Sequence, residues 1–276
     1  MITHAVVLGI IQGLTEFIPV SSSAHLLVFP HLLRWPDMGL AFDVACHWGT
    51  LAALIVYFRN DWAVILRSFA TGKAVQDNAS QTAAESGVGG GILVPIIVAC
   101  VPAAVAGLFL NDKIEALRTW PGLVQTIAGV LIGIGLVMRL AEYVGKKRRG
   151  IGEMNWIDYI VIGIAQALAL FPGVSRSGIT ISAGLFRNLD RAAAARFSFL
   201  LSTPIILGAG LLELAKLLTR GFARDQASLF AVGLVTSAIS GYLAIRFLMS
   251  YLARKPLDVF VTYRICFAVF LLLASQ

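Results

Sequence analysis

One segment of this chain occurs twice. Residues 9–23, GIIQGLTEFIPVSSS, recur 154 residues later as residues 163–177, GIAQALALFPGVSRS, without a gap and with eight of fifteen positions identical. Each copy is an apolar run that is interrupted by proline and a group of serines. In membrane proteins, broken hydrophobic segments at matching places in two halves indicate a binding site where the halves meet. The duplication therefore predicts two related halves whose broken segments lie together.

The composition identifies the environment of the chain. Of the 276 residues, 58% are hydrophobic and 13% are charged, whereas a soluble domain is about 45–50% apolar and about 25% charged. We therefore expect a single membrane domain over residues 1–276, surrounded by lipid, and exclude soluble enzymes. The net charge of +7 does not indicate a nucleic-acid partner, because the basic residues lie in short loops between apolar runs.

The apolar runs define the expected membrane segments. A spanning helix needs about 20 mostly apolar residues. Two segments, 4–34 and 157–187, are broken near their midpoints, and the arm before each break has only about 14 residues, too few to cross. We predict that both are re-entrant helix–loop–helix hairpins. Six uninterrupted stretches qualify as spans: 41–58, 92–110, 122–142, 194–216, 227–250 and 257–275.

The order of these segments predicts their topology. Each half has one hairpin followed by three spans, and because three is odd the second half must be inverted relative to the first. We therefore expect an all-α polytopic membrane protein with six transmembrane helices and two re-entrant hairpins, its inverted repeats covering about 1–145 and about 155–276. Placing the basic break at 145–155 in the cytoplasm leaves eleven Lys and Arg residues there against six opposite, so both termini are expected outside. Residues 60–90 are expected to form a cytoplasmic loop.

The first hairpin combines a carboxylate, hydroxyls and an imidazole. Gln12 and Glu16 are four residues apart and share a helix face, as do Ser22 and His25, three apart. Pro19 ends the first helix, and the serines that follow are suited to begin the returning one. Ionisable groups are costly at membrane depth and mark functional sites. The alternative is a water-filled cavity or a polar network that only packs helices.

The second hairpin offers an anion site. It turns at Pro172–Gly173 and returns with Ser175, Arg176 and Ser177. The N–H groups at a helix start and a bidentate arginine both favour phosphate. A carboxylate near that anion would repel it unless the carboxylate is protonated or a divalent cation lies between them. Glu16 is therefore a candidate ligand for Mg²⁺ or Ca²⁺.

Two further polar residues need an interpretation. His47 has no comparable neighbours in the sequence, and we assign it to helix packing or the membrane interface. Arg264 lies inside the last predicted span, so it must face protein or a cavity. A structural ion pair and a contact with the substrate are both open for Arg264.

The two motifs resemble a known family. Residues 12–25, QGLTEFIPVSSSAH, and residues 171–180, FPGVSRSGIT, resemble the first and second motifs of the undecaprenyl-diphosphate phosphatase family of the bacitracin-resistance type. Weaker signatures at Phe197 and at Tyr263-Arg264 also match, so the resemblance covers the whole chain. It implies cleavage of the terminal phosphate from the polyprenyl diphosphate carrier of cell-wall synthesis. It also implies a location in the bacterial inner membrane, with an active site that faces the periplasm.

The resemblance also assigns residues to roles. Gln12 stands where the family often has Glu. The implied catalytic residues are Glu16, Ser22, His25 and Arg176. The implied substrate-binding residues are Gln12, Ser21, Ser23, Ser175, Ser177 and Thr180.

The chemistry of the site leaves alternatives. Ser22 can attack the terminal phosphorus with His25 as base and then acid, or a metal-bound water can attack with His25 as acid. The expected partner is a polyprenyl diphosphate, and a homodimer is a further prediction. A lipid-phosphate transporter would share the inverted-repeat architecture, and a protein that only sequesters the lipid is a third reading. A transporter needs an anion site, but it does not need a nucleophile and a base beside it.

Overall fold

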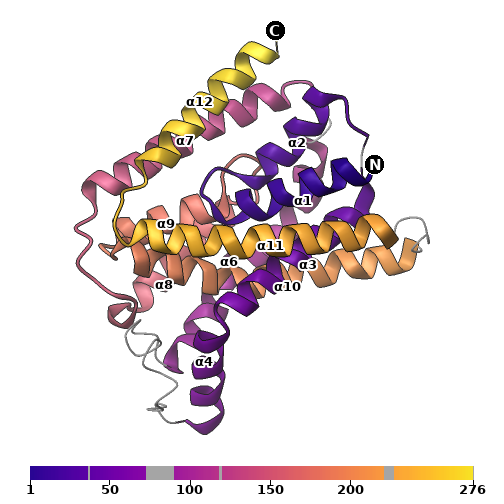
Figure 1. The fold of residues 1–276 in the computed structure, drawn as a ribbon. Coiled ribbons are helices and arrows are strands. Elements are labelled where there is room, and N and C mark those ends of the chain that lie inside the picture. The colour runs from indigo at the N-terminus through magenta and orange to yellow at the C-terminus, as the bar shows by residue number, and fades with distance from the viewer. Residues whose placement is uncertain (37, 73–89, 118–119, 221–226, 276) are drawn as a thin grey trace.

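A computed structural model describes the chain except residues 37, 73–89, 118–119, 221–226 and 276. The described residues form helices, and no strand occurs among them (Figure 1). The helices are α1 (Ile2–Phe17), α2 (Ser22–Leu33), α3 (Gly39–Tyr57), α4 (Arg59–Thr71), α6 (Leu93–Leu117), α7 (Leu123–Val144), α8 (Trp156–Leu168), α9 (Arg176–Phe186), α10 (Arg191–Arg220), α11 (Ala227–Leu252) and α12 (Asp258–Ala274), with 3-10 turns at Gly90–Ile92 and Ile151–Glu153.

The long helices confirm a multi-pass membrane protein. Among the described residues, α6, α7, α10 and α11 are long and apolar enough to cross a bilayer by themselves. The pair α3 and α4 passes the same test together, although it bends by 74°. Four of the six expected spans therefore have the required length and composition by themselves, and a fifth, 41–58, passes only together with α4. Helix α12, in the expected span 257–275, has 17 residues and does not pass this test.

Both predicted hairpins are broken where the sequence indicates. The first break lies between α1 and α2, and the second lies between α8 and α9. Ser21 and Ser175, which occupy matching positions of the repeat, have φ angles of 80° and 72°. A positive φ is uncommon for a residue other than glycine, and here it turns the chain sharply into the returning helix. The Ser175 hydroxyl then accepts the Gly178 N–H at 3.2 Å and caps α9.

The prediction of a loop over residues 60–90 is wrong for the first part of that range, because residues 59–71 form α4. Ile65 on this helix is fully buried in the hydrophobic core, and Asp61 forms an ion pair with Arg196 on α10 at 2.6 Å. These tertiary contacts hold an amphipathic segment as a helix despite its low overall hydrophobicity. Residues 73–89 of the expected loop lie outside the described part of the chain.

Corresponding helices of the two halves pack in corresponding ways. Helix α1 packs on α11, and α8 packs on α6. A Cβ atom at Gly13 on α1 would come within 2.0 Å of the Ser240 hydroxyl, and one at Gly163 on α8 within 2.5 Å of the Ala99 carbonyl oxygen. Glycine is required at both contacts because the helix backbones approach so closely. Helices α7 and α12 complete the arrangement side by side (Figure 1).

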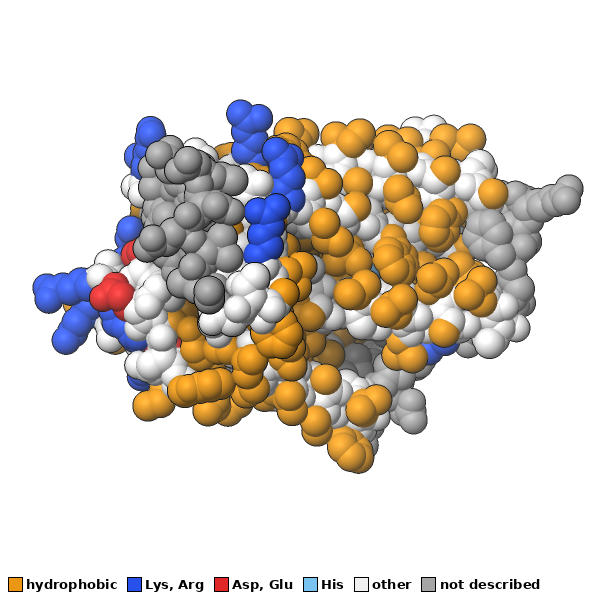
Figure 2. All heavy atoms as spheres, turned by 90° about the horizontal axis from the view of Figure 1, so that it is seen from below, with side chains coloured by type: hydrophobic (Ala, Val, Ile, Leu, Met, Phe, Trp, Pro, Cys, Tyr) orange, Lys and Arg blue, Asp and Glu red, His pale blue; other side chains and the backbone are white. Residues whose placement is uncertain are grey.

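The outer surface suits a lipid environment. Figure 2 shows a broad face covered by hydrophobic side chains, with most of the visible Lys and Arg side chains gathered toward one end. Large apolar side chains such as Leu108 and Phe109 are about four-fifths exposed, at 81% and 80%. Apolar groups that face outward together with basic groups at one end are the distribution expected of a protein embedded in a bilayer.

Candidate active site

The tips of the two hairpins meet although they are far apart in the sequence. The backbone N–H of Gly173 in the second hairpin donates to the Ser23 hydroxyl of the first at 3.2 Å. Beside this contact, Arg176 at the start of α9 forms an ion pair with Glu16 near the end of α1. The predicted meeting of the two broken segments is therefore confirmed.

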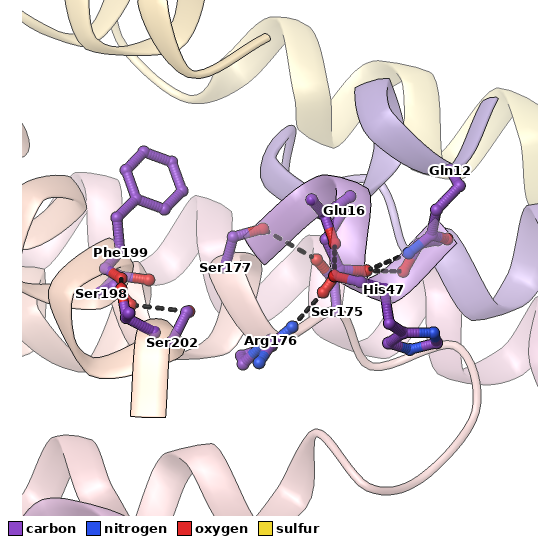
Figure 3. A network of polar contacts seen from close by, with 12 residues as sticks. Gln12, Glu16, His47, Ser175, Arg176, Ser177, Ser198, Phe199 and Ser202 are labelled. Carbon is purple, nitrogen blue, oxygen red and sulfur yellow. Dashed lines mark hydrogen bonds and ion pairs between the residues drawn. The ribbon is translucent and has the colours of Figure 1, made fainter. Parts of the chain in front are cut away.

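Glu16 is the centre of the polar network in Figure 3. One of its carboxylate oxygens, Oε2, accepts the Gln12 amide N–H at 3.0 Å and the Ser22 hydroxyl at 2.8 Å. The other oxygen, Oε1, pairs with Nη2 of Arg176. The side chains of Glu16 and Arg176 are only 7% and 17% exposed. Each buried charge is thus compensated by the other, which is the condition under which such groups are tolerated.

His25 lies in the same hairpin but bonds to other groups. Its Nδ1 lies 2.7 Å from the carbonyl oxygen of Ser21, and its Nε2 lies 2.7 Å from the hydroxyl of Tyr263 on α12. Because a carbonyl only accepts, Nδ1 carries the proton of the neutral ring and Nε2 accepts from Tyr263. The ring also stacks on Phe267, with centroids 4.4 Å apart. The structure therefore brings Ser22 to Glu16 and His25 to Tyr263, and its hydrogen bonds do not join Ser22 to His25.

The remaining predicted residues contact the protein itself. Ser175 and Ser177 lie within 3.3 Å of each other through their hydroxyls, and Thr180 contacts both the Arg176 carbonyl at 2.7 Å and the Ser198 hydroxyl at 2.6 Å. Ser175, Ser177 and Thr180 are buried. In this structure they fix the backbone that carries Arg176. In the first hairpin, the Ser21 and Ser23 hydroxyls lie 3.2 Å apart, with Ser21 buried and Ser23 exposed.

The structure adds two residues that sequence reasoning did not place in the site. His47, on α3, lies near Glu16 (Figure 3), whereas the sequence assigned it to helix packing or the membrane interface. Its Nδ1 contacts the Asp43 carbonyl at 2.8 Å. The second addition is Tyr263, for which the weak Tyr-Arg signature was a signal. No local pattern marks His47, because α3 reaches the hairpin only through tertiary packing.

The donor set limits how a divalent cation could be held. Among the described residues, no group of three or more His, Cys, Asp and Glu side chains is arranged to hold a metal ion. Mg²⁺, however, is commonly bound by one or two carboxylates together with substrate phosphates. Glu16 fits that second mode, as the single carboxylate at the position where a phosphate would pair with Arg176.

These features define a class: a multi-pass helical membrane protein whose two broken hairpins join a carboxylate, hydroxyls and an arginine in one site. The family model for the bacitracin resistance protein BacA matches residues 5–270, so the chain belongs to that family. Three similar relatives are each named undecaprenyl-diphosphatase. They come from Thermomicrobium roseum (46% identity over 98% of this chain and 96% of the relative), Geobacter sulfurreducens (46%, 96% and 94%) and Thermodesulfovibrio yellowstonii (45%, 98% and 95%).

Proposed function

We propose that this protein hydrolyses undecaprenyl diphosphate to undecaprenyl phosphate and phosphate, and so recycles the lipid carrier of cell-wall synthesis. The family match over residues 5–270 and the names of the relatives support this activity. The observation that carries the proposal is the Ser22 hydroxyl, which donates to Glu16 at 2.8 Å while Arg176 pairs with the same carboxylate. A potential nucleophile, a proton acceptor and a phosphate-binding cation thus lie together.

Substrate binding is assigned to Arg176 and the start of α9. A guanidinium has five N–H donors, and Glu16 engages Nη2 of Arg176, so other donors can pair with phosphate oxygens. The N-terminus of α9 adds a favourable field for the same anion. A divalent cation that arrives with the diphosphate, with Glu16 as its carboxylate ligand, would reduce the repulsion between the carboxylate and the phosphates.

The chemical step is assigned to Ser22 and Glu16. The Ser22 oxygen attacks the terminal phosphorus, Glu16 accepts the hydroxyl proton, and the bond between that phosphorus and the bridging oxygen breaks. The lipid monophosphate leaves, and water then hydrolyses the phosphoserine. Arg176 stabilises the charge on the transferring group, because phosphoryl transfer depends mainly on positioning and electrostatics. His25 stays proposed as a proton donor, since its Nε2 can gain a proton. Direct attack by water on phosphorus is the alternative.

Replacing Ser22 by alanine separates these two routes. The serine route predicts a labelled phosphoserine that rapid acid quenching traps from substrate carrying a radioactive terminal phosphate. In Ser22→Ala this intermediate is lost and turnover falls by about 1000-fold or more, because removing a catalytic serine nucleophile costs up to about a million-fold in kcat. Ser250→Ala, at an exposed serine on α11, is the matched control and should still form the intermediate. Substantial turnover in Ser22→Ala would favour attack by water.

We also propose the finer topology: six spans and two re-entrant hairpins in an inverted repeat, with the active site open to the periplasm. The matching breaks and the matching contacts of α1 with α11 and of α8 with α6 support the repeat. The excess of basic residues on one side supports the orientation. A homodimer stays a prediction.

Thiol labelling tests the orientation. In a background that lacks Cys46, Cys100 and Cys266, Ser23→Cys should react with an impermeant maleimide added to intact spheroplasts, and substrate should protect it. Ala24→Cys is the matched control and should stay unreactive, because Ala24 is fully buried. Labelling of Ser23→Cys only in inverted vesicles would overturn the orientation, and labelling from both sides would favour the transporter.

A further inference from the structure

Arg264 is a charged side chain in the interior that the proposed chemistry does not use. It lies on α12 and is fully buried. Its Nε donates to the Leu131 carbonyl at 3.2 Å, and its Nη1 donates to the Pro19 carbonyl at 3.4 Å. Its Nη2 donates to the carbonyls of Gly173 at 2.8 Å and Val174 at 3.3 Å. All four of these partners are backbone oxygens, so the contacts match neither the ion pair nor the substrate contact considered from the sequence.

The partners of Arg264 occupy related places in the two halves. Pro19 and Gly173 are separated by 154 residues, the offset of the internal repeat, and each lies at the tip of its hairpin. One guanidinium therefore joins the tip of the first hairpin to the tip of the second, and through Leu131 it joins both to α7. Buried carbonyls in a turn need donors, because an unpaired backbone group in an apolar interior is costly.

The carbonyls that Arg264 binds lie close in sequence to both residues of the active-site ion pair. Glu16 precedes Pro19 by three residues, and Arg176 follows Gly173 by three. The contacts of Arg264 therefore fix the two backbone segments that carry the carboxylate and the guanidinium. A displacement of about 1 Å between catalytic groups can cost about 100-fold in rate, so the separation of the tips matters directly for chemistry.

We propose that Arg264 is a positioning residue that locks the two hairpin tips together through the matching carbonyls of Pro19 and Gly173. The lock keeps Glu16 and Ser22 of one hairpin at a fixed separation from Arg176 of the other. Lysine cannot replace it, because the planar fork of arginine directs separate donors to three segments and a single ammonium does not. The consequence for turnover rests on the proposed function, whereas the lock itself does not.

A distance measurement tests the lock without reference to activity. Leu14 on α1 and Leu168 on α8 occupy matching positions of the repeat, and both are exposed. Spin labels on cysteines at these positions, in the background lacking Cys46, Cys100 and Cys266, report the separation of the hairpins by pulsed dipolar spectroscopy. We expect a narrow distribution with Arg264 present and a broader one in Arg264→Met. Arg246→Met is the matched control, because Arg246 is an exposed arginine on α11, and its distribution should stay narrow.

Kinetics on the unlabelled variants completes the test. In Arg264→Met, kcat should fall by about 100-fold, while KM should stay within about threefold because the groups that bind substrate remain. Arg264→Lys keeps the buried charge and guards against a variant that does not fold; it too should broaden the distribution and lose turnover.

Normal turnover with a narrow distribution in Arg264→Lys would overturn the proposal. Lost turnover with a narrow distribution in both variants would also overturn it, because Arg264 would then affect turnover without holding the hairpin tips together. If the labelled variants broaden but the wild-type protein does not release phosphate, the lock stands and the proposed function fails.

Discussion

Replacement of Arg176 by alanine should lower kcat by about 1000- to 100,000-fold, the range measured for arginines that stabilise phosphoryl transfer. Arg176→Lys should lose nearly as much. The guanidinium pairs with Glu16, and in the proposed function it also binds a phosphate. The single ammonium of lysine cannot reproduce that planar arrangement. Release of inorganic phosphate from undecaprenyl diphosphate by the purified variants measures the effect.

Two controls separate a catalytic loss from a folding defect. Arg139 forms an exposed ion pair with Asp258, and such surface pairs contribute little, so Arg139→Ala should keep normal turnover. Removing Arg176 leaves the buried Glu16 carboxylate without its partner, which destabilises the fold. The double variant Arg176→Ala/Glu16→Gln should therefore regain thermal stability relative to Arg176→Ala without regaining activity. Near-normal turnover in Arg176→Lys would show that only the local positive charge matters.

Glu16→Gln is expected to lower kcat by about 100- to 10,000-fold, the usual effect of removing a general acid or base. The amide keeps the shape of the side chain, so the protein should fold. It carries no charge, and therefore it neither accepts the Ser22 proton nor serves as an anionic ligand for a cation. Phosphate release with and without a chelator, at matched protein concentrations, measures both losses. A fully retained metal-dependent rate in Glu16→Gln would show that the proposed cation role of Glu16 is wrong.

Gln12→Glu is the matched control for this position. Gln12 lies one helical turn before Glu16 and donates an amide N–H to it at 3.0 Å. The family that the motif resembles often has Glu at the position of Gln12, so the variant should remain active. A second carboxylate beside Glu16 is stable only if it is protonated or shares a cation. We therefore expect the turnover of Gln12→Glu to be more sensitive to chelator than that of the wild-type protein.

The sequence alone determined the features that depend on local spacing. Apolar composition predicted the membrane environment, and the interrupted repeat predicted both helical breaks. The spacing of Gln12 and Glu16 placed the two side chains on one helix face, where they form a hydrogen bond. These features were accessible because a helix period and a turn are properties of neighbouring residues. The motifs around them also identified the family, which the match over residues 5–270 confirms.

Only the tertiary structure decided which of these groups touch. His25 and Ser22 share a helix face in the sequence, yet His25 bonds to Tyr263, 238 residues away, and Ser22 bonds to Glu16. His47 reaches the site from α3. Arg264 binds backbone carbonyls, and because every residue has a carbonyl, the sequence does not reveal which of them are its partners. Helix α4 is stabilised by tertiary contacts: Ile65 packs in the hydrophobic core, and Asp61 forms an ion pair with Arg196 on α10. In each case the deciding contact joins elements that are distant along the chain, and its geometry depends on how whole helices pack rather than on any local pattern.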